Sequence, residues 1–466
     1  MDGHECSEVF LSEMLKNGRM DAEYYAKEYI YETEQLLKRD HFNIGKHYKV
    51  TDGEHGSVEY LDEGVKYLTA ENIKKGYVDL SKIRYVSEDV DKRNARASVR
   101  EGDILISIKG TLGQIAVATS ELVPCNMNRD VAIIKPLFPN TKSNYFLALF
   151  MMGKYGALQS QRGGSGGVQQ MITLGRLREF IIPKFQDELY DIVKDAYEQF
   201  LNLMKQSKNC LEEAEEFLLS ELNFDLNSMS TNAITIKTLS ESFGKAQRID
   251  AEYYQPKYDD YEKHVREYVG GFTTPRKEFD LIKTKCLKDL PEYRYIEIGD
   301  IEIGSGRAYY DIVQTEDLPA NAKIMTKKGD LLVSTVRPYR GAVSILQEDD
   351  FLVSGAFTVL RSKTDYPAQT LQVLFRTRFY KDWFLKFNCG TSYPVIKDDD
   401  VLDIPIPIFE DGIHSKISEY VIHSQKLLGM ASGLLDSAKA AVEMAIEIDE
   451  IKAKKWLEEK LVEFSE

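Results

Sequence analysis

The chain has 466 residues and a formal net charge of −15, from 60 Lys and Arg against 75 Asp and Glu. This length allows two to four domains with cores of their own, and a composition of 43% hydrophobic and 29% charged residues excludes a disordered or fibrous protein. The longest apolar run, Tyr145–Gly153, is far shorter than the roughly 18 residues of a membrane span.

Charge is distributed unevenly along the chain. Residues 186–226 hold eleven acidic and three basic residues, and residues 410–466 hold twelve and seven, so these stretches carry −13 of the −15. Residues 92–185 instead hold thirteen basic against five acidic residues, and residues 320–397 hold twelve against six. The total charge argues against a nucleic-acid-binding protein, but basic bodies are typical of one. Solvated faces of mixed charge would give the same counts.

In chain order, a strand-rich body is expected first and a long helix after it. Apolar runs predict strands at 103–108, 114–118 and 131–134, and a helix at 144–158. From Asp187 to Leu222, apolar residues recur every three or four positions, which predicts an amphipathic helix about 54 Å long.

The second half predicts the same order of elements. Strands are expected at 330–334, 342–346 and 357–360, and a helix at 368–387. A second long helix is expected from Ile413 to Phe464, weakened locally by Gly429 and Gly433. Because each long helix exceeds the needs of one small core, the two are expected to pair in antiparallel fashion. The bodies are of the α+β class.

The two halves also share sequence motifs, which indicates an old duplication. Three segments recur at offsets that fall from 229 to 224 residues: Arg19–Tyr25 as Arg248–Tyr254, Glu101–Ser107 as Lys328–Ser334, and Ile172–Phe185 as Ile396–Phe409. The first of these, Arg-x-Asp-Ala-Glu-Tyr-Tyr, is expected to be a helix start that packs each body onto its long helix. A binding epitope is the alternative.

The sequence lacks the common motifs of enzyme active sites. It has no GxGxxG, GxxxxGK[ST], GxSxG or HExxH, and its seven histidines are dispersed. Gly163–Gly167 could hold a phosphate through backbone amides or could be a plain loop. We therefore expect no catalytic residue, bound cofactor or metal in this chain.

Five scattered cysteines include no CxxC pair, so neither a disulfide framework nor a zinc site is expected. The acidic first residues have no apolar h-region, so no secretory signal is expected either. These features favour a reducing cytoplasm.

Three segments occur in a fixed order: Gly102–Gly113, Gln170–Pro183 and Ala214–Leu222. Together they resemble the specificity (S) subunit of type I restriction–modification systems, and the resemblance covers nearly the whole chain. The second copy is looser. Gly329–Ser334 keeps the first motif, but Val336-Arg-Pro338 replaces Lys-Gly-Thr, and Cys389–Ser392 stands where the glycine-rich loop was.

The resemblance implies two tandem target-recognition domains, separated and followed by long helices that pair as an antiparallel coiled coil. Residues 1–185 would form the first domain with a short N-terminal helical segment, 186–226 the central spacer helix, 227–409 the second domain, and 410–466 the C-terminal spacer helix. Each domain would read one part of a two-part asymmetric target in double-stranded DNA.

The resemblance also implies that this chain is a non-catalytic subunit. Two modification (methyltransferase) subunits would dock on the spacer helices and a restriction translocase would join them. S-adenosylmethionine, ATP and magnesium are expected on those partners.

Candidate DNA-contacting residues are polar side chains that follow an apolar strand or flank a glycine loop. In the first body they are Lys109, Thr111, Arg129, Gln161, Arg162 and Ser165, and in the second Arg337, Tyr339, Arg340, Asn388, Thr391, Ser392 and Tyr393. Arginine favours guanine, whereas lysine and serine more often hold phosphates. Each could also be an ordinary surface residue.

Two other functions stay open on the sequence. One is a DNA-specificity chain that serves a modification-only or other phage-defence complex. The other is an acidic tandem-repeat scaffold or DNA mimic that binds proteins through its helices. The second predicts no affinity of the bodies for duplex DNA.

Overall fold

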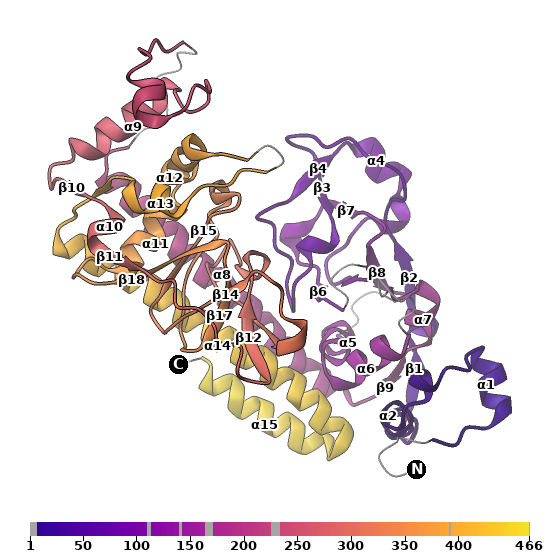
Figure 1. The fold of residues 1–466 in the computed structure, drawn as a ribbon. Coiled ribbons are helices and arrows are strands. Elements are labelled where there is room, and N and C mark those ends of the chain that lie inside the picture. Colours follow the sequence, from indigo (N-terminus) through magenta and orange to yellow (C-terminus); the bar gives the residue numbers. More distant parts are fainter. Residues whose placement is uncertain are drawn as a thin grey trace. The chain divides into compact units, whose positions relative to one another are not determined.

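Figure 1 shows the computed structural model, which describes residues 7–109, 113–138, 142–163, 171–224, 234–390 and 393–465. The chain divides into two compact units: residues 1–204 with 428–466, and residues 205–427. Each unit holds one strand-rich body and a part of both long helices.

The first unit contains a four-stranded sheet and a three-stranded sheet. The four-stranded sheet is antiparallel throughout and has the order β2 (Tyr48–Asp52), β8 (Val131–Pro136), β5 (Ile104–Ser107), β6 (Ile115–Val117). The smaller sheet has the order β4 (Arg84–Val86), β3 (Val65–Leu68), β7 (Cys125–Met127), and β3 runs parallel to β7. A ribbon pairs β1 (His41–Asn43) with β9 (Ile181–Pro183).

The second unit repeats this topology. Its antiparallel sheet has the order β11 (Phe279–Leu281), β18 (Phe357–Ser362), β15 (Leu331–Ser334), β16 (Val343–Ile345). Its mixed sheet has the order β13 (Asp311–Gln314), β12 (Glu292–Ile296), β17 (Phe351–Ser354), β14 (Ala322–Met325), with β12 parallel to β17. β10 (Phe272–Thr273) pairs with β19 (Ile406–Pro407). The duplication therefore extends to the strand order, and β14 is an addition to the second sheet.

Short helices complete both bodies. Those of the first are α1 (Leu11–Asn17), α2 (Lys27–Leu37), α3 (Ile44–His47), α4 (Glu88–Arg93), α5 (Ser143–Met152), α6 (Lys154–Gly163) and α7 (Leu174–Glu179). Those of the second are α9 (Pro256–Arg266), α10 (Pro275–Glu278), α11 (Ala368–Arg376), α12 (Arg378–Trp383) and α13 (Asp398–Asp403).

The helices predicted at 144–158 and 368–387 are present, but each is broken at an equivalent position. The first breaks at Gly153, whose backbone is extended. The second breaks at Thr377, whose hydroxyl accepts a hydrogen bond from the Tyr380 N–H and caps a new helix.

The long helices α8 (Asp187–Glu221) and α14 (Asp411–Glu447) pair in antiparallel fashion. In the first unit, Phe200 and Leu435 both lie against Gly76. In the second unit, the buried hydroxyls of Ser207 and Ser424 are 2.8 Å apart. Position 200 lies near position 435 and position 207 near position 424, so the two helices run in opposite directions. This confirms the predicted coiled-coil pairing.

The predicted continuous helix from Ile413 to Phe464 is wrong at one point, because the chain turns between α14 and α15 (Glu450–Glu463). The Asp449 side chain accepts a hydrogen bond from the Lys452 N–H at 2.9 Å and starts the new helix. Helix α14 continues through Gly433, where a Cβ would lie 2.6 Å from the Phe464 ring. This glycine therefore admits the folded-back end of the chain.

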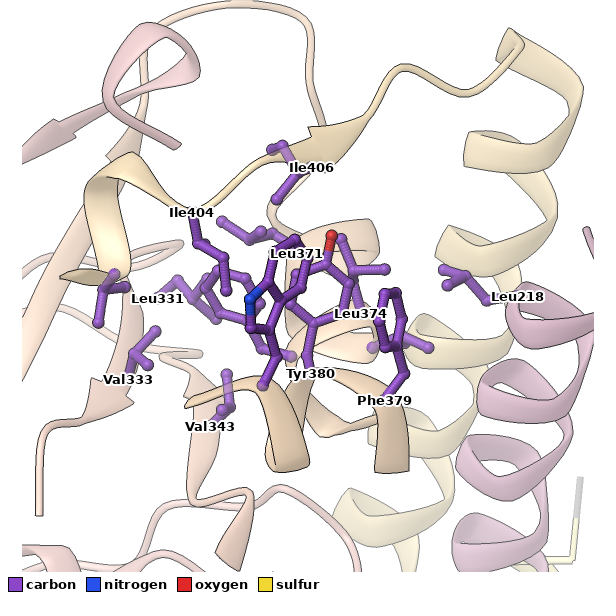
Figure 2. Packing of buried hydrophobic residues seen from close by; sticks show 14 of the residues in the cluster. Leu218, Leu331, Val333, Val343, Leu371, Leu374, Phe379, Tyr380, Ile404 and Ile406 are labelled. Carbon is purple, nitrogen blue, oxygen red and sulfur yellow. The ribbon is translucent and has the colours of Figure 1, made fainter. Parts of the chain in front are cut away.

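The core of the second unit joins its sheet to the helices (Figure 2). Leu331, Val333 and Val343 of the sheet pack with Leu371, Leu374, Phe379 and Tyr380 of α11 and α12, and with Leu218 of α8. Each such buried side chain stabilises the fold by about 1.5–3 kcal/mol.

Within the described ranges, no helix combines the length and apolar character of a membrane span.

Candidate nucleic-acid interface

The same end of the central strand is closed in the same way in both bodies. After β5, Lys109 forms an antiparallel β-bridge with Met171, and the Ile172 N–H donates to the Ile108 carbonyl at 3.2 Å. After β15, Val336 forms an antiparallel β-bridge with Val395, and the Ile396 N–H donates to the Thr335 carbonyl at 2.9 Å. We call these places the first and second strand-end surfaces. Most of the DNA-contacting residues predicted for the second body lie at the second surface. Of those predicted for the first body, two described residues lie at the first surface.

The first strand-end surface brings together Lys109, which is half-buried, and Arg129, which is exposed. The Ile108 N–H donates to the Asp130 carbonyl at 3.0 Å, which places the residues before β8 beside those after β5. Two cations predicted from separate segments therefore share one end of the sheet.

Gln161 and Arg162 lie in the last turn of α6, where Gln161 is exposed. The Arg162 guanidinium donates to the Tyr24 carbonyl at 2.9 Å and to the Thr33 hydroxyl at 3.0 Å, and it lies 4.3 Å from the centroid of the Tyr24 ring. These contacts hold the N-terminal segment on α6, so they favour an architectural role for Arg162. Its predicted contact with DNA stays a prediction.

The second strand-end surface is organised around Arg337. Its backbone is left-handed, with φ 52° and ψ 51°, and its N–H donates to the Pro394 carbonyl at 2.7 Å. The guanidinium lies 5.9 Å from the ring centroid of half-exposed Tyr393. Tyr339 and Arg340 follow in a 3-10 turn, Tyr339 36% exposed and Arg340 half-buried. A left-handed arginine persists only where the surrounding structure imposes it.

Asn388 shapes the neighbouring loop. Its side-chain oxygen accepts the N–H groups of Gly390 and Val395, both at 3.0 Å. A Cβ on Gly390 would lie 1.8 Å from the Tyr393 carbonyl oxygen, so only glycine fits this turn. Asn388 thus positions Tyr393 beside Arg337. The other predicted residues, Thr111, Ser165, Thr391 and Ser392, lie outside the described residues, as does most of Gly163–Gly167.

The structure shows a basic surface that the sequence prediction missed. Residues 284–286 run beside β14, where the Cys286 N–H donates to the Lys323 carbonyl at 3.1 Å and Lys285 bridges Ile324. Exposed Lys285 and Lys323 lie on these paired segments, and two further exposed lysines, Lys327 and Lys328, follow β14, where the Lys328 N–H donates to the Asp349 carboxylate at 2.9 Å; we call these four lysines the lysine edge. These lysines are up to 43 positions apart, so only the strand pairing reveals them as one group. Lys327 and Lys328 precede β15, whereas Arg337 follows it.

The repeated Gly-Asp motif has a structural role in both bodies. Asp330 is fully buried and accepts two hydrogen bonds from the Arg361 guanidinium, at 2.7 and 2.8 Å. Asp103 lies 3.5 Å from the Lys135 ammonium. Burial raises the pKa of Asp103 and lowers that of Lys135. The motif therefore fixes the turn before the central strand.

Each body is also bonded to the part of α8 in its own unit. The Tyr197 hydroxyl donates to the Gly76 carbonyl at 2.6 Å. In the second unit, the Arg376 guanidinium donates to the Ile303 and Gly304 carbonyls, at 2.7 and 3.0 Å, and to Glu215 at 3.2 Å. Burial raises the pKa of Glu215, although Arg376 opposes this shift.

The Arg-x-Asp-Ala-Glu-Tyr-Tyr motif forms the same turn twice. Arg19 donates to both oxygens of Asp21, at 2.5 and 2.7 Å, and Arg248 to both oxygens of Asp250, at 2.8 and 2.6 Å. The Tyr25 hydroxyl donates to the Arg19 carbonyl at 3.1 Å, and the Tyr254 hydroxyl to the Arg248 carbonyl at 3.1 Å. The motif thus locks a turn before α2 and α9, and in the first copy it begins a short 3-10 helix, Ala22–Tyr25, after Asp21.

The first body is similar to known proteins. Residues 42–213 match the family model described as "Type I restriction modification DNA specificity domain". Over 76 residues the chain is 33% identical to the Type I restriction enzyme EcoBI specificity subunit of Escherichia coli, and the match spans 16% of this chain and 16% of that relative. The resemblance indicated by the sequence motifs is therefore confirmed.

Solved structures also match along most of the chain, at low similarity. The Type-I restriction-modification system S subunit from M. genitalium is 14% identical, with 90% of this chain and 95% of that one covered and a TM-score of 0.37. The HsdS subunit from Thermoanaerobacter tengcongensis is 12% identical, with 91% and 96% covered and a TM-score of 0.27.

Proposed function

We propose that this chain is the sequence-specific DNA-recognition subunit of a type I restriction–modification complex and that each body reads one half of a two-part asymmetric target. One observation carries the proposal: residues 42–213 match the family model of a DNA specificity domain, and the strand order of the first body recurs in the second. A duplicated scaffold of this kind suits one protein that reads two half-sites.

The two strand-end surfaces carry different cations, which supports the reading of two different half-sites. Lys109 and Arg129 of the first correspond to Val336 and Gly355 of the second, where the arginine is instead Arg337. An arginine fork can meet guanine O6 and N7 together, whereas a lysine is a point charge suited to phosphate. Bodies with one backbone and different cations would therefore prefer different bases.

The acidic helices suit a spacer that avoids DNA. At 1.5 Å per residue, the 35 residues of α8 extend about 52 Å, which equals about 15 base-pair steps of 3.4 Å. Residues 186–226 hold eleven acids against three bases, so phosphates repel this surface. We propose that it faces protein partners and sets the unread gap between half-sites.

The proposed partners supply the chemistry. Two modification subunits would methylate DNA with S-adenosylmethionine, and a restriction translocase would use ATP and magnesium. This chain would position them without a catalytic residue of its own, in the cytoplasm.

Selection from a randomised duplex library tests DNA reading directly. The purified full-length chain, with its modification subunits, should enrich a two-part motif with a fixed gap, and binding should weaken as salt rises. An acidic scaffold or DNA mimic would enrich no sequence. The basic strand-end surfaces and the specificity domain favour DNA reading over that alternative.

A further inference from the structure

Arg248 connects the locked turn before α9 to the second strand-end surface. Its guanidinium donates two hydrogen bonds to Asp250, at 2.8 and 2.6 Å, and another to the Asn388 carbonyl at 2.8 Å. Its Nη1 lies 3.6 Å from the Cys389 Sγ. The planar fork of an arginine presents its donors in fixed directions. Because Asp250 holds the fork in place, the fork holds the backbone at Asn388.

Asn388 carries this connection on to Arg337. Its side-chain oxygen accepts the Val395 N–H at 3.0 Å, and the Pro394 carbonyl accepts the Arg337 N–H at 2.7 Å. This carbonyl and the Val395 N–H belong to one planar peptide group, so a rotation at one end moves the other. Hydrogen bonds therefore link Arg248, through one asparagine and one peptide group, to the left-handed backbone of Arg337.

The equivalent turn in the first half has no such asparagine. Arg19 donates to both oxygens of Asp21, as Arg248 does to its own aspartate. The position equivalent to Asn388, at an offset of 224 residues, is Gly164, which lies outside the described residues. A glycine has no side-chain oxygen that could hold a peptide group. The turn is thus common to both halves, but the asparagine connection belongs to the second.

Another contact already attaches the turn to each body. The Lys386 ammonium lies 5.3 Å from the centroid of the Tyr253 ring, and in the first half the Arg162 guanidinium lies 4.3 Å from that of Tyr24. Lys386 and Arg162 occupy equivalent positions, at an offset of 224 residues. Because this cation and tyrosine recur in both halves, the bond from Arg248 to the second strand-end surface is additional to what attachment requires.

We propose that Arg248 is a positioning residue for base reading in the second half-site, an inference that rests on the proposed function. Arg248 contacts no base. It orients the peptide group between Pro394 and Val395, and thereby Arg337, so that the Arg337 fork meets the base edge at a fixed angle. Base selection depends on this two-bond geometry, whereas contacts with phosphates carry no sequence information.

Competition binding by the full-length chain in complex with its modification subunits tests this role. The probe is a fluorescent duplex with the target that the wild type selects, and the competitors each carry one changed base pair in the first or second half. Discrimination is the Kd for the changed duplex divided by that for the target. Arg248→Ala should lower discrimination in the second half about tenfold and leave it within about twofold of wild type in the first.

Further variants separate positioning from attachment. Asp250→Asn weakens the turn but keeps the bond from Arg248 to Asn388, so second-half discrimination should persist. Arg19→Ala, at the equivalent position of the first half, should also leave it unchanged. Arg248→Lys keeps the charge without the fork and should lose discrimination as Arg248→Ala does. Combining Arg248→Ala with Asn388→Ala should lose no more than the stronger single variant, because both act through one peptide group.

Circular dichroism verifies folding. Wild-type discrimination in the second half by folded Arg248→Ala and Arg248→Lys would overturn the inference and leave the proposed function intact. Equal losses in both halves, the same loss in Asp250→Asn, or unfolding of both Arg248 variants would overturn it too, since each indicates a purely structural role. A wild-type complex that discriminates no base pair in either half would instead contradict the proposed function.

Discussion

Asp330, which precedes β15, and Arg361, which lies on β18, form an ion pair with two hydrogen bonds in the second body, and the carboxylate is fully buried. Asp330 also accepts the Lys327 N–H at 2.8 Å, so it closes the turn that begins β15. The equivalent Asp103 accepts the Arg100 N–H at 2.8 Å but lies 3.5 Å from its lysine. The second body therefore depends more strongly on this pair.

Asp330→Asn should lower the free energy of unfolding of the second unit by about 2 kcal/mol, because it weakens buried charge-assisted hydrogen bonds. Urea denaturation measures this change. The exposed control Asp365→Asn should stay within about 0.5 kcal/mol of the wild type. Equal stability of both variants would show that the motif is kept for another reason.

Glu215 predicts a pH dependence. Because burial raises its pKa in the folded chain, the folded state binds a proton more readily than the unfolded state. This group therefore stabilises the fold as pH falls through the raised value, and the gain is lost as pH rises. Comparing wild type with Glu215→Gln by urea denaturation from pH 7 to pH 4.5 should show stability of the wild type rising relative to the variant. A constant difference would contradict this assignment.

Arg337→Ala with Arg340→Ala should abolish the preference for the second half of the target, because it removes the cations of the second strand-end surface. Fluorescence anisotropy at two salt concentrations measures it, with Lys363→Ala as an exposed control in the same body. Unaltered affinity at both salt concentrations would exclude these arginines from the interface.

The lysine edge predicts a different response. If Lys285 and Lys323 lie along phosphates, replacing both by Ala should weaken binding equally for target and non-target duplexes. The slope of log K against log salt should become shallower by about 2. An unchanged slope would show that the lysine edge does not contact DNA. The lysine edge lies at the end of β15 opposite to the second strand-end surface.

Spacer length predicts the gap. Seven residues inserted after Ser207, with seven inserted before Ser424, preserve the helix faces and add about 10 Å, or about three base pairs. The selected target should keep both halves and gain a gap longer by that amount. Retention of the original gap would show that α8 and α14 do not set it.

Much of this architecture was predictable because it depends on local periodicity. The buried β5 and β15 and the apolar stripe of α8 lie where the apolar patterns placed them. The turn before α15 carries a local signal in the Asp449 cap, but the position of Phe464 beside Gly433 is a long-range feature that the local pattern does not contain.

Site residues were predictable only in part. Lys109 and Arg129, each predicted to contact DNA, lie at one end of the sheet, after β5 and before β8. Arg162 reads as a surface cation in the sequence, yet the fold engages it with Tyr24 and Thr33, 138 and 129 positions away. The lysine edge likewise arises from pairing of distant segments.

Genome-wide mapping of methylated adenines in cells that co-express the chain with its neighbouring modification subunit tests the central claim most directly. The account predicts one two-part motif with a fixed gap, whose second half alone changes when Arg337 and Arg340 are replaced. Absent or random methylation, with assembly of the complex verified, would contradict it.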